Sequence, residues 1–214
     1  MKPYNFVEKT FMTPYSKAVA SYCNKFECGD QDLDEYFEED AFLYEKELLG
    51  KTYCWIDKQN KKDIIAIATL SYDGIKTNSL DKSSRNALQR KIPYNKHHRS
   101  YPAVLIGRLG VDKKFQGQGL KIGTQLLELL KYWFLDESNK AACRYLLVDA
   151  YNSERTLCFY ERNGFKMLYK TEEREREAFH VERDRQLNSR IMYFDLKTFI
   201  PSTSEESSEC RVES

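Results

Sequence analysis

The sequence predicts a mixed α/β fold, with helices flanking one central sheet. A nearly continuous apolar run over 104–111 has the pattern of a buried strand, and apolar residues then recur at helical spacing over 122–134. A second strand, helix and strand are predicted over 144–168, and a hairpin of two strands over 52–72. Together these elements predict a sheet with helices packed on it.

The first fifty residues predict one strand and two helices. Alternation of side chains predicts a strand over Tyr4–Thr10, and a short helix is expected over Tyr15–Cys23. Asp30 has the side chain of an N-cap, and an apolar stripe at helical spacing follows it to about Leu49. Gly50 is the expected C-cap of that helix.

A hairpin and a polar segment come next. The hairpin strands are Thr52–Asp57 and Ile64–Tyr72, joined by a polar turn. Segment 78–101 is the most basic local stretch, with one helical turn expected around Leu88. A solvated loop is one interpretation of its charges, and contact with an anionic substrate is the other. The candidate contacts are Arg90, Lys96 and Arg99.

The strand, helix and strand after residue 143 have local signals at each boundary. Arg144–Ala150 is apolar enough for a buried strand, and either Asn152 or Ser153 has a side chain that caps helices. The helix is predicted over Glu154–Asn163, and the next strand over Phe165–Leu168.

The remaining residues predict one surface excursion, one strand and a tail. Segment 171–188 is dense in charge, which is typical of an exposed turn or helix, and Arg190–Leu196 has the pattern of a last strand. Residues 201–214 are rich in Ser and Glu and are expected to be disordered. With no internal repeat, a single domain is expected over 1–200.

Composition excludes several classes of protein. The 214 residues hold 34 Lys and Arg against 33 Asp and Glu, which argues against a strongly basic nucleic-acid binder. No apolar stretch is long enough for a membrane span, and the first residues lack the pattern of a signal peptide. The 6 cysteines form no Cys-x-x-Cys pair. We therefore expect a cytoplasmic protein with reduced thiols, no metal site and no membrane association.

A glycine-rich turn, Gln116–Gly123, lies between the strand over 104–111 and the helix over 122–134. Glycines let the backbone approach a ligand closely, and the first N–H groups of a helix favour an anion such as phosphate. The spacing is not that of a Walker A loop, and the dinucleotide-binding fingerprint fits poorly. A phosphorylated ligand is the favoured interpretation, and an ordinary tight turn is the alternative.

Two segments resemble the hallmarks of the GNAT N-acetyltransferases: Leu105-Ile-Gly-Arg-Leu-Gly-Val-Asp-Lys-Lys-Phe-Gln-Gly-Gln-Gly119 and Leu157-Cys-Phe-Tyr-Glu-Arg-Asn-Gly-Phe165. The resemblance implies a mostly antiparallel sheet and acetyl-CoA as cosubstrate. Against the family spacing, the loop carries two extra residues, so its phosphate donors are expected between Gln118 and Gly123. The implied cofactor-binding residues are Leu109, Gly110, Val111, Gln116, Gly117, Gln118, Gly119, Lys121, Gly123, Asn152 and Ser153.

The same resemblance implies a catalytic role for Tyr160. A phenol is protonated at neutral pH and can give its proton to the thiolate that leaves acetyl-CoA. The alternative is that Tyr160 only packs in the core. Many family members carry a Glu base on the central strand, where this chain has Arg108. Because Arg cannot act as a base, Arg108 is expected to bind an anion or to have a structural role.

A narrower resemblance concerns the acceptor of the acetyl group. Phe26-x-Cys-Gly29, followed by Leu33-Asp-x-Tyr36, is similar to toxins of this family that acetylate aminoacyl-tRNA. On that basis Arg108, Arg90, Lys96 and Arg99 are substrate candidates, and a homodimer is plausible. A small amine and a protein amino group stay open as acceptors, as does a non-catalytic module that binds acyl-CoA.

Overall fold

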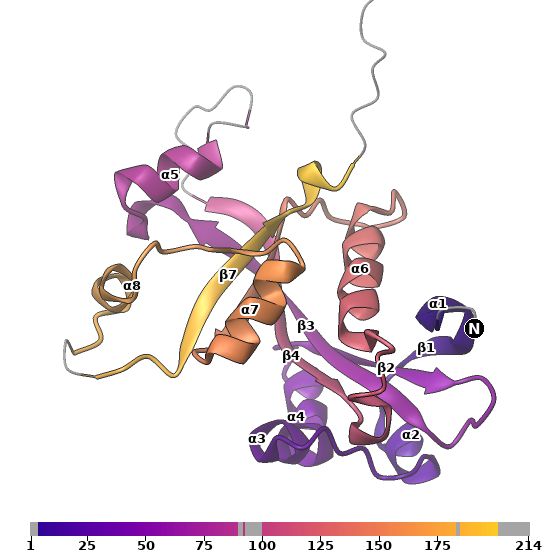
Figure 1. Cartoon of the computed structure of the whole chain (residues 1–214). Coiled ribbons are helices and arrows are strands. Elements are labelled where there is room, and N and C mark those ends of the chain that lie inside the picture. Colours follow the sequence, from indigo (N-terminus) through magenta and orange to yellow (C-terminus); the bar gives the residue numbers. More distant parts are fainter. Residues whose placement is uncertain (1–3, 90–91, 93–99, 183–184, 201–214) are drawn as a thin grey trace, which may run out of the picture.

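The structure is a computed structural model that describes residues 4–89, 92, 100–182 and 185–200 (Figure 1). Its strands join one sheet in the order β1-β2-β3-β4-β5-β7-β6. β4 and β5 are parallel, and the other neighbours are antiparallel, which confirms the predicted mixed α/β fold. The strands are β1 Thr10–Pro14, β2 Lys51–Asp57, β3 Ile64–Lys76, β4 Ser100–Val111, β5 Tyr145–Tyr151, β6 Lys166–Met167 and β7 Ser189–Asp195.

Helices cover both faces of this sheet. Figure 1 shows α6 and α7 over one face, while α2, α3 and α4 gather on the other, beside β2, β3 and β4. A π-helical turn, Tyr36–Asp40, joins α3 to α4. The helices are α1 Phe6–Lys9, α2 Lys17–Tyr22, α3 Gln31–Glu35, α4 Ala41–Lys46, α5 Lys82–Gln89, α6 Ile122–Leu135, α7 Glu154–Arg162 and α8 Glu172–Phe179.

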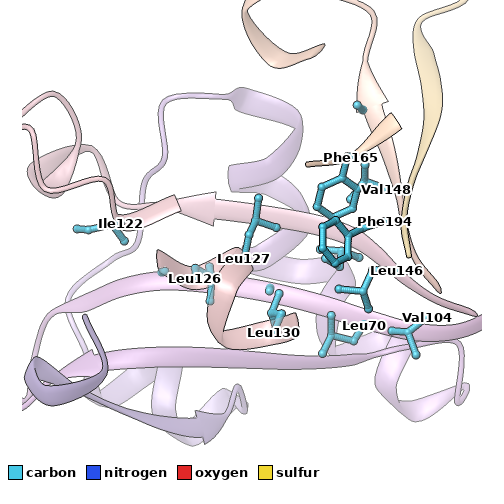
Figure 2. Close-up of a cluster of buried hydrophobic side chains, with 14 of the residues drawn as sticks. Leu70, Val104, Ile122, Leu126, Leu127, Leu130, Leu146, Val148, Phe165 and Phe194 are labelled. Carbon is cyan, nitrogen blue, oxygen red and sulfur yellow. The ribbon is translucent and has the colours of Figure 1, made fainter. Parts of the chain in front are cut away.

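The apolar core lies on both sides of the sheet because strand side chains alternate between its faces. On one side, the leucines of α6 lie over β3, β4 and β5. Figure 2 shows this for Leu130 of α6 and Leu146 of β5. On the other, Phe26 and Phe37 pack with Ile67 of β3. The central strands β3 and β4 are thus buried on both faces, which explains their continuous apolar sequences.

The strand predicted over Tyr4–Thr10 is wrong. Asn5 caps a short helix, α1, by accepting the N–H of Glu8, and the strand begins only at Thr10. The Phe6 ring is fully buried against Trp55, so this turn fills the end of the core. A four-residue helix is too short to show a helical period, which is why alternation misled the prediction.

The helix predicted from Asp30 begins as expected but ends early. The Asp30 side chain accepts the N–H of Leu33, which confirms the N-cap. The predicted C-cap, Gly50, is wrong: α4 ends at Lys46, and Leu48 takes the left-handed φ of 57°. At Gly50 a Cβ would lie 3.1 Å from the Thr69 methyl group, so this glycine serves a close approach to β3.

Two polar segments hold more structure than their composition indicates. The expected single turn around Leu88 is the eight-residue helix α5, whose Leu88 is buried. The charged segment after residue 170 contains α8, and its Glu175 is buried in an ion pair with Arg190 of β7. The predicted tail over 201–214 lies outside the described residues.

Candidate active site

The central feature of the site is a separation of β4 from β5. The ladder between these strands covers Ala103 to Ile106, whereas the ladder between β4 and β3 continues to Val111. A bulge at Gly107 marks the separation, since Thr69 faces Arg108 while the neighbouring Leu70 faces Ile106. One edge of the last five residues of β4 therefore lies open toward β5, with backbone groups available to a ligand.

Side chains of the open part of β4 point alternately to the two faces. Leu109 and Val111 pack toward α6. A Cβ at Gly110 would lie 3.1 to 3.2 Å from the rings of Phe26 and Phe37, so glycine allows those rings to rest on the strand. Phe26, from the first motif of the narrower resemblance, thus packs directly against this strand at Gly110.

Arg108, the substrate candidate, is exposed on the same side as α3. Its Nη1 donates to the Gly107 carbonyl at 2.7 Å, and its guanidinium lies 5.1 Å from the centre of the Tyr36 ring. Across the gap, the Tyr151 hydroxyl of β5 lies 3.4 Å from Oδ1 of Asp30. Sequence reasoning missed Tyr36 and Tyr151 as neighbours of this gap, because only the fold brings their elements together.

The glycine-rich loop follows β4 and a short turn. Gly117 and Gly119 both have a φ of 71°, and a Cβ at either would meet nothing within 4 Å. The loop is therefore open on its outer side, and its shape depends on backbone conformations that favour glycine. Lys121 has a φ of 52° and is exposed.

The side chain of Gln116 holds this loop on the strand. Its Nε2 donates to the Val111 carbonyl at 2.6 Å and to the Cys28 carbonyl at 2.8 Å. Gln118 likewise uses its amide inside the loop, on the carbonyl of Lys114. Both glutamines were predicted to bind the cofactor; the contacts of their side chains give them a part in shaping the loop.

The N-terminus of α6 presents unused donors. From Gly117 to Thr124, no backbone N–H has an acceptor among the described residues. The first helical hydrogen bond is the one that the N–H of Gln125 donates to the carbonyl of Lys121. No side chain caps this 14-residue helix. Backbone N–H groups and the positive end of the helix dipole suit a phosphate group, so these residues fit the pyrophosphate of CoA.

Helix α7 lies against the start of α6. At Gly123 a Cβ would lie 3.1 Å from the Phe159 ring, so glycine permits this approach. The next residue, Tyr160, packs edge-on to Phe159 and Phe165, with ring centres 5.1 and 5.5 Å apart. Burial raises the pKa of Tyr160 to about 12. The structure thus brings the predicted acid and the predicted phosphate loop onto adjoining helices.

Of the two predicted helix caps, Ser153 is the one used. Its hydroxyl accepts the N–H of Thr156 at the start of α7. The Asn152 amide instead donates to Glu172 at 3.1 Å and to the Leu187 carbonyl at 2.9 Å, so it ties β5 to α8. Asn152, the other predicted cap, therefore does not cap α7.

Three of the substrate candidates are not placed by the structure. Arg90, Lys96 and Arg99 lie outside the described residues. Over the described ranges, no group of three His, Cys, Asp or Glu side chains could hold a metal ion. In the same residues no helix is long and apolar enough to cross a membrane.

Solved structures with the same fold include bacterial toxins. AtaT in complex with acetyl-methionyl-tRNAfMet is 18% identical, with a TM-score of 0.58, and the match covers 89% of this chain and 96% of AtaT. A tyrosine-to-phenylalanine mutant of KacT is 20% identical over the same shares, also with a TM-score of 0.58. AtaTR bound with AcCoA is 20% identical, with a TM-score of 0.57 and coverage of 89% and 96%.

A match to a protein family decides the identity. Residues 51–167, more than half of the chain, match the family described as acetyltransferase (GNAT) domain. The match begins at β2 and ends in β6, so it includes the separated strands, the glycine-rich loop and Tyr160. The chain therefore belongs to the GNAT family of acetyltransferases.

Proposed function

We propose that this protein transfers the acetyl group of acetyl-CoA to the α-amino group of an aminoacyl-tRNA in the cytoplasm. The observation that carries the acetyl-CoA half is the run of backbone N–H groups from Gly117 to Thr124, for which the described part of the chain supplies no acceptor. The acceptor half is supported by the shared fold of AtaT, whose solved complex contains acetyl-methionyl-tRNAfMet.

The loop and β4 would hold the two ends of the cosubstrate. The pyrophosphate binds the N–H groups at the start of α6, with the Lys121 ammonium available to its charge. The pantetheine arm then runs along the open edge of β4, where N–H groups between Leu109 and Val111 bind the thioester oxygen. Ser153, at the start of α7, stays a proposed contact of the cofactor.

The reaction requires one proton at the sulfur and the removal of another from nitrogen. The neutral amine attacks the carbonyl carbon of the thioester, the C–S bond breaks, and the electron pair leaves with sulfur. Tyr160 gives its phenolic proton to that sulfur, water takes the proton lost by nitrogen, and a proton returned from water restores the phenol. A phenol is protonated at neutral pH with its ordinary pKa, and burial raises the pKa of Tyr160 further, to about 12.

The acceptor would approach through the gap beside Arg108. The Arg108 guanidinium, held over the Tyr36 ring, presents positive charge to an anion such as a tRNA phosphate. Arg90, Lys96 and Arg99 are proposed further phosphate contacts. An aminoacyl ester has an amine of low pKa, which makes a protein base unnecessary.

In the test, the protein is incubated with acetyl-CoA that carries a radiolabelled acetyl group and with total tRNA charged with each amino acid in turn. Acid-precipitable label that is released as an N-acetyl amino acid by alkali supports the proposal. Tyr160→Phe is the matched variant, and we expect kcat to fall by roughly a hundredfold or more with an unchanged KM for acetyl-CoA. Full kcat in Tyr160→Phe would remove the acid assignment.

Two other acceptor classes and one other function are outcomes of the same experiment. Label on a small amine or on a peptide, with none on tRNA, would leave an acetyltransferase with another acceptor. Calorimetric binding of acetyl-CoA without any transfer would identify a non-catalytic acyl-CoA-binding module. If the protein is a toxin, its expression should arrest growth, and an antitoxin should be its partner. A solved structure of an AtaT mutant contains the C-terminus of the antitoxin AtaR. A homodimer stays a prediction.

A further inference from the structure

Helix α6 carries a buried lysine that the proposed chemistry does not use. Lys131 is only 4% exposed. Its Nζ donates to the Asn163 carbonyl at 2.7 Å, which joins α6 to the end of α7 across 32 residues of sequence. An ammonium group has three donors, and burial without full pairing is unfavourable, so its retention here needs an explanation.

Three aromatic rings surround the same ammonium group. Its Nζ lies 4.0 Å from the centre of the Phe194 ring, 5.4 Å from Phe199 and 5.8 Å from Phe165. Ring faces attract a cation within about 6 Å, and more strongly when water is excluded. The contacts therefore fix the lysine head between the turn that follows α7, strand β7 and the segment after β7.

Asn163, which receives this hydrogen bond, organises the last turn of α7. Its Nδ2 donates to the Phe159 carbonyl at 2.7 Å, and its backbone N–H lies 3.0 Å from the Tyr160 carbonyl. The N–H of Phe165 also donates to the Tyr160 carbonyl, at 3.0 Å. The Tyr160 carbonyl thus accepts hydrogen bonds from the same turn, 163–165, whose Asn163 carbonyl is bound by Lys131.

Helix α6 therefore holds α7 at two points. One is Gly123, against the Phe159 ring, and the other is Lys131, on the Asn163 carbonyl. Eight residues separate them on one rigid helix, a distance of about 12 Å. The first point lies in the loop proposed to bind pyrophosphate, so the same helix sets both the cosubstrate and the helix of Tyr160.

We propose that Lys131 is a positioning residue for the acetyl transfer, which holds the last turn of α7 so that the Tyr160 hydroxyl meets the sulfur of the leaving CoA. This inference rests on the proposed acid role of Tyr160. A lysine with only a stabilising role in the core would give a different result, because its loss would lower stability without acting through the phenol.

The decisive experiment is a double-mutant cycle on acetyl transfer to charged tRNA, with Lys131→Met, Tyr160→Phe and the double variant. We expect Lys131→Met to lower kcat by roughly tenfold or more, with little change in KM for acetyl-CoA. In the Tyr160→Phe background the same change should lower kcat no further, because the phenol it positions is gone. Equal losses in both backgrounds would overturn the proposal.

Two further variants separate positioning from general instability. Leu130→Ala removes a fully buried side chain of the same helix, so it supplies a destabilised control that keeps the Lys131 contacts. It should lower the melting temperature and leave the kcat of the folded enzyme close to normal. Lys131→Arg keeps a cation and donors, and should recover most of the kcat that Lys131→Met loses.

Hydrogen exchange tests the inference without any turnover. With acetyl-CoA bound, Lys131→Met should speed exchange at the amides of Gly164 and Phe165, relative to Leu130→Ala at equal global stability. Unchanged exchange there overturns the inference and leaves the proposed function standing. Faster exchange in a protein whose Tyr160→Phe variant keeps full kcat overturns the acid role instead, and with it the positioning of that acid.

Discussion

At the residue scale, one partly buried phenol separates the proposed chemistry from ordinary packing. Tyr160 packs against the core edge-on to Phe159 and Phe165, so its ring is a core side chain while its hydroxyl is the proposed acid. Desolvation disfavours the phenolate, which raises the pKa of Tyr160 to about 12. Both properties follow from the same burial.

This shift predicts the pH dependence of activity and stability. An ordinary phenol ionises near pH 10, whereas Tyr160 would stay protonated well beyond that. We therefore expect kcat to show no loss from this phenol between neutral pH and about pH 10. A fall of kcat in that range in the unmodified enzyme, absent from Tyr160→Phe, would contradict the raised pKa.

The sign for stability follows from linkage. Because the folded pKa of Tyr160 is above the unfolded value, its contribution to the free energy of unfolding is fully present below about pH 10. It is lost as pH rises from there toward the folded pKa of about 12. Urea unfolding at increasing alkaline pH should show a smaller decline for Tyr160→Phe than for the unmodified chain.

At the scale of elements, the loop before α6 depends on the left-handed backbone of Gly117 and Gly119. Gly119→Val places a β-branched residue at a φ of 71°, where only glycine is readily accommodated, although a Cβ would meet no neighbour within 4 Å. The loop should therefore change shape, and acetyl-CoA affinity measured by calorimetry should fall roughly tenfold or more.

A truncated ligand provides the control for that loop. Acetyl-pantetheine lacks the pyrophosphate, so its weaker binding should be the same in Gly119→Val and the unmodified protein. Equal loss of both ligands would mean that the substitution damages the whole site, and it would count against a phosphate-binding loop.

Helix α8 is held by one buried carboxylate. Glu175 accepts hydrogen bonds from Nε of Arg190 at 2.5 Å and from the N–H of Ile191 at 2.6 Å. Burial raises the pKa of Glu175, while the Arg190 guanidinium acts in the opposite direction. Glu175→Gln should lower the free energy of unfolding by about 2 kcal/mol, because it weakens the pairing of a buried arginine.

The matched control lies on the same helix. Glu177 forms an ion pair with Arg174 in which both side chains are 59% exposed, so Glu177→Gln should change stability by less than about 0.5 kcal/mol. Denaturant unfolding of the two variants measures the difference. Similar losses would mean that burial of the Glu175 pair does not decide its contribution.

At the scale of the whole molecule, the fold separates the proposed partners. Helices α6 and α7 lie on one face with the proposed cosubstrate site, whereas α3 lies on the other side with Arg108 over Tyr36 (Figure 1). The separation of β4 from β5 connects the two sides. An acetyl group bound along β4 can thus meet an amine that enters from the face of α3.

Net charge at this scale predicts the salt response of tRNA binding. With 34 basic and 33 acidic residues, long-range attraction to a polyanion is weak, and affinity must come from a few local cations. We expect the logarithm of tRNA affinity to fall linearly with the logarithm of salt, with the slope of only a few phosphate contacts. Filter binding over a salt series measures it, and Arg108→Ala should reduce the slope by about one contact.

Predictions from sequence were accurate where neighbours along the chain decide the structure. The strand of 104–111, the glycine-rich turn and the helix from Ile122 follow from side-chain periodicity and backbone freedom, which are local properties. The order of the motifs was enough to identify the family, which the match over 51–167 confirms. The roles of individual site residues stay predictions.

The sequence by itself thus determined the fold class, the family and the place of the glycine-rich loop before α6. Only the tertiary structure decided that β4 leaves β5 at Gly107, that Ser153 rather than Asn152 caps α7, and that Lys131 reaches Asn163. These features depend on contacts between residues distant in sequence. The energies of such contacts come from burial and pairing in three dimensions, and no periodicity or spacing along the chain records them.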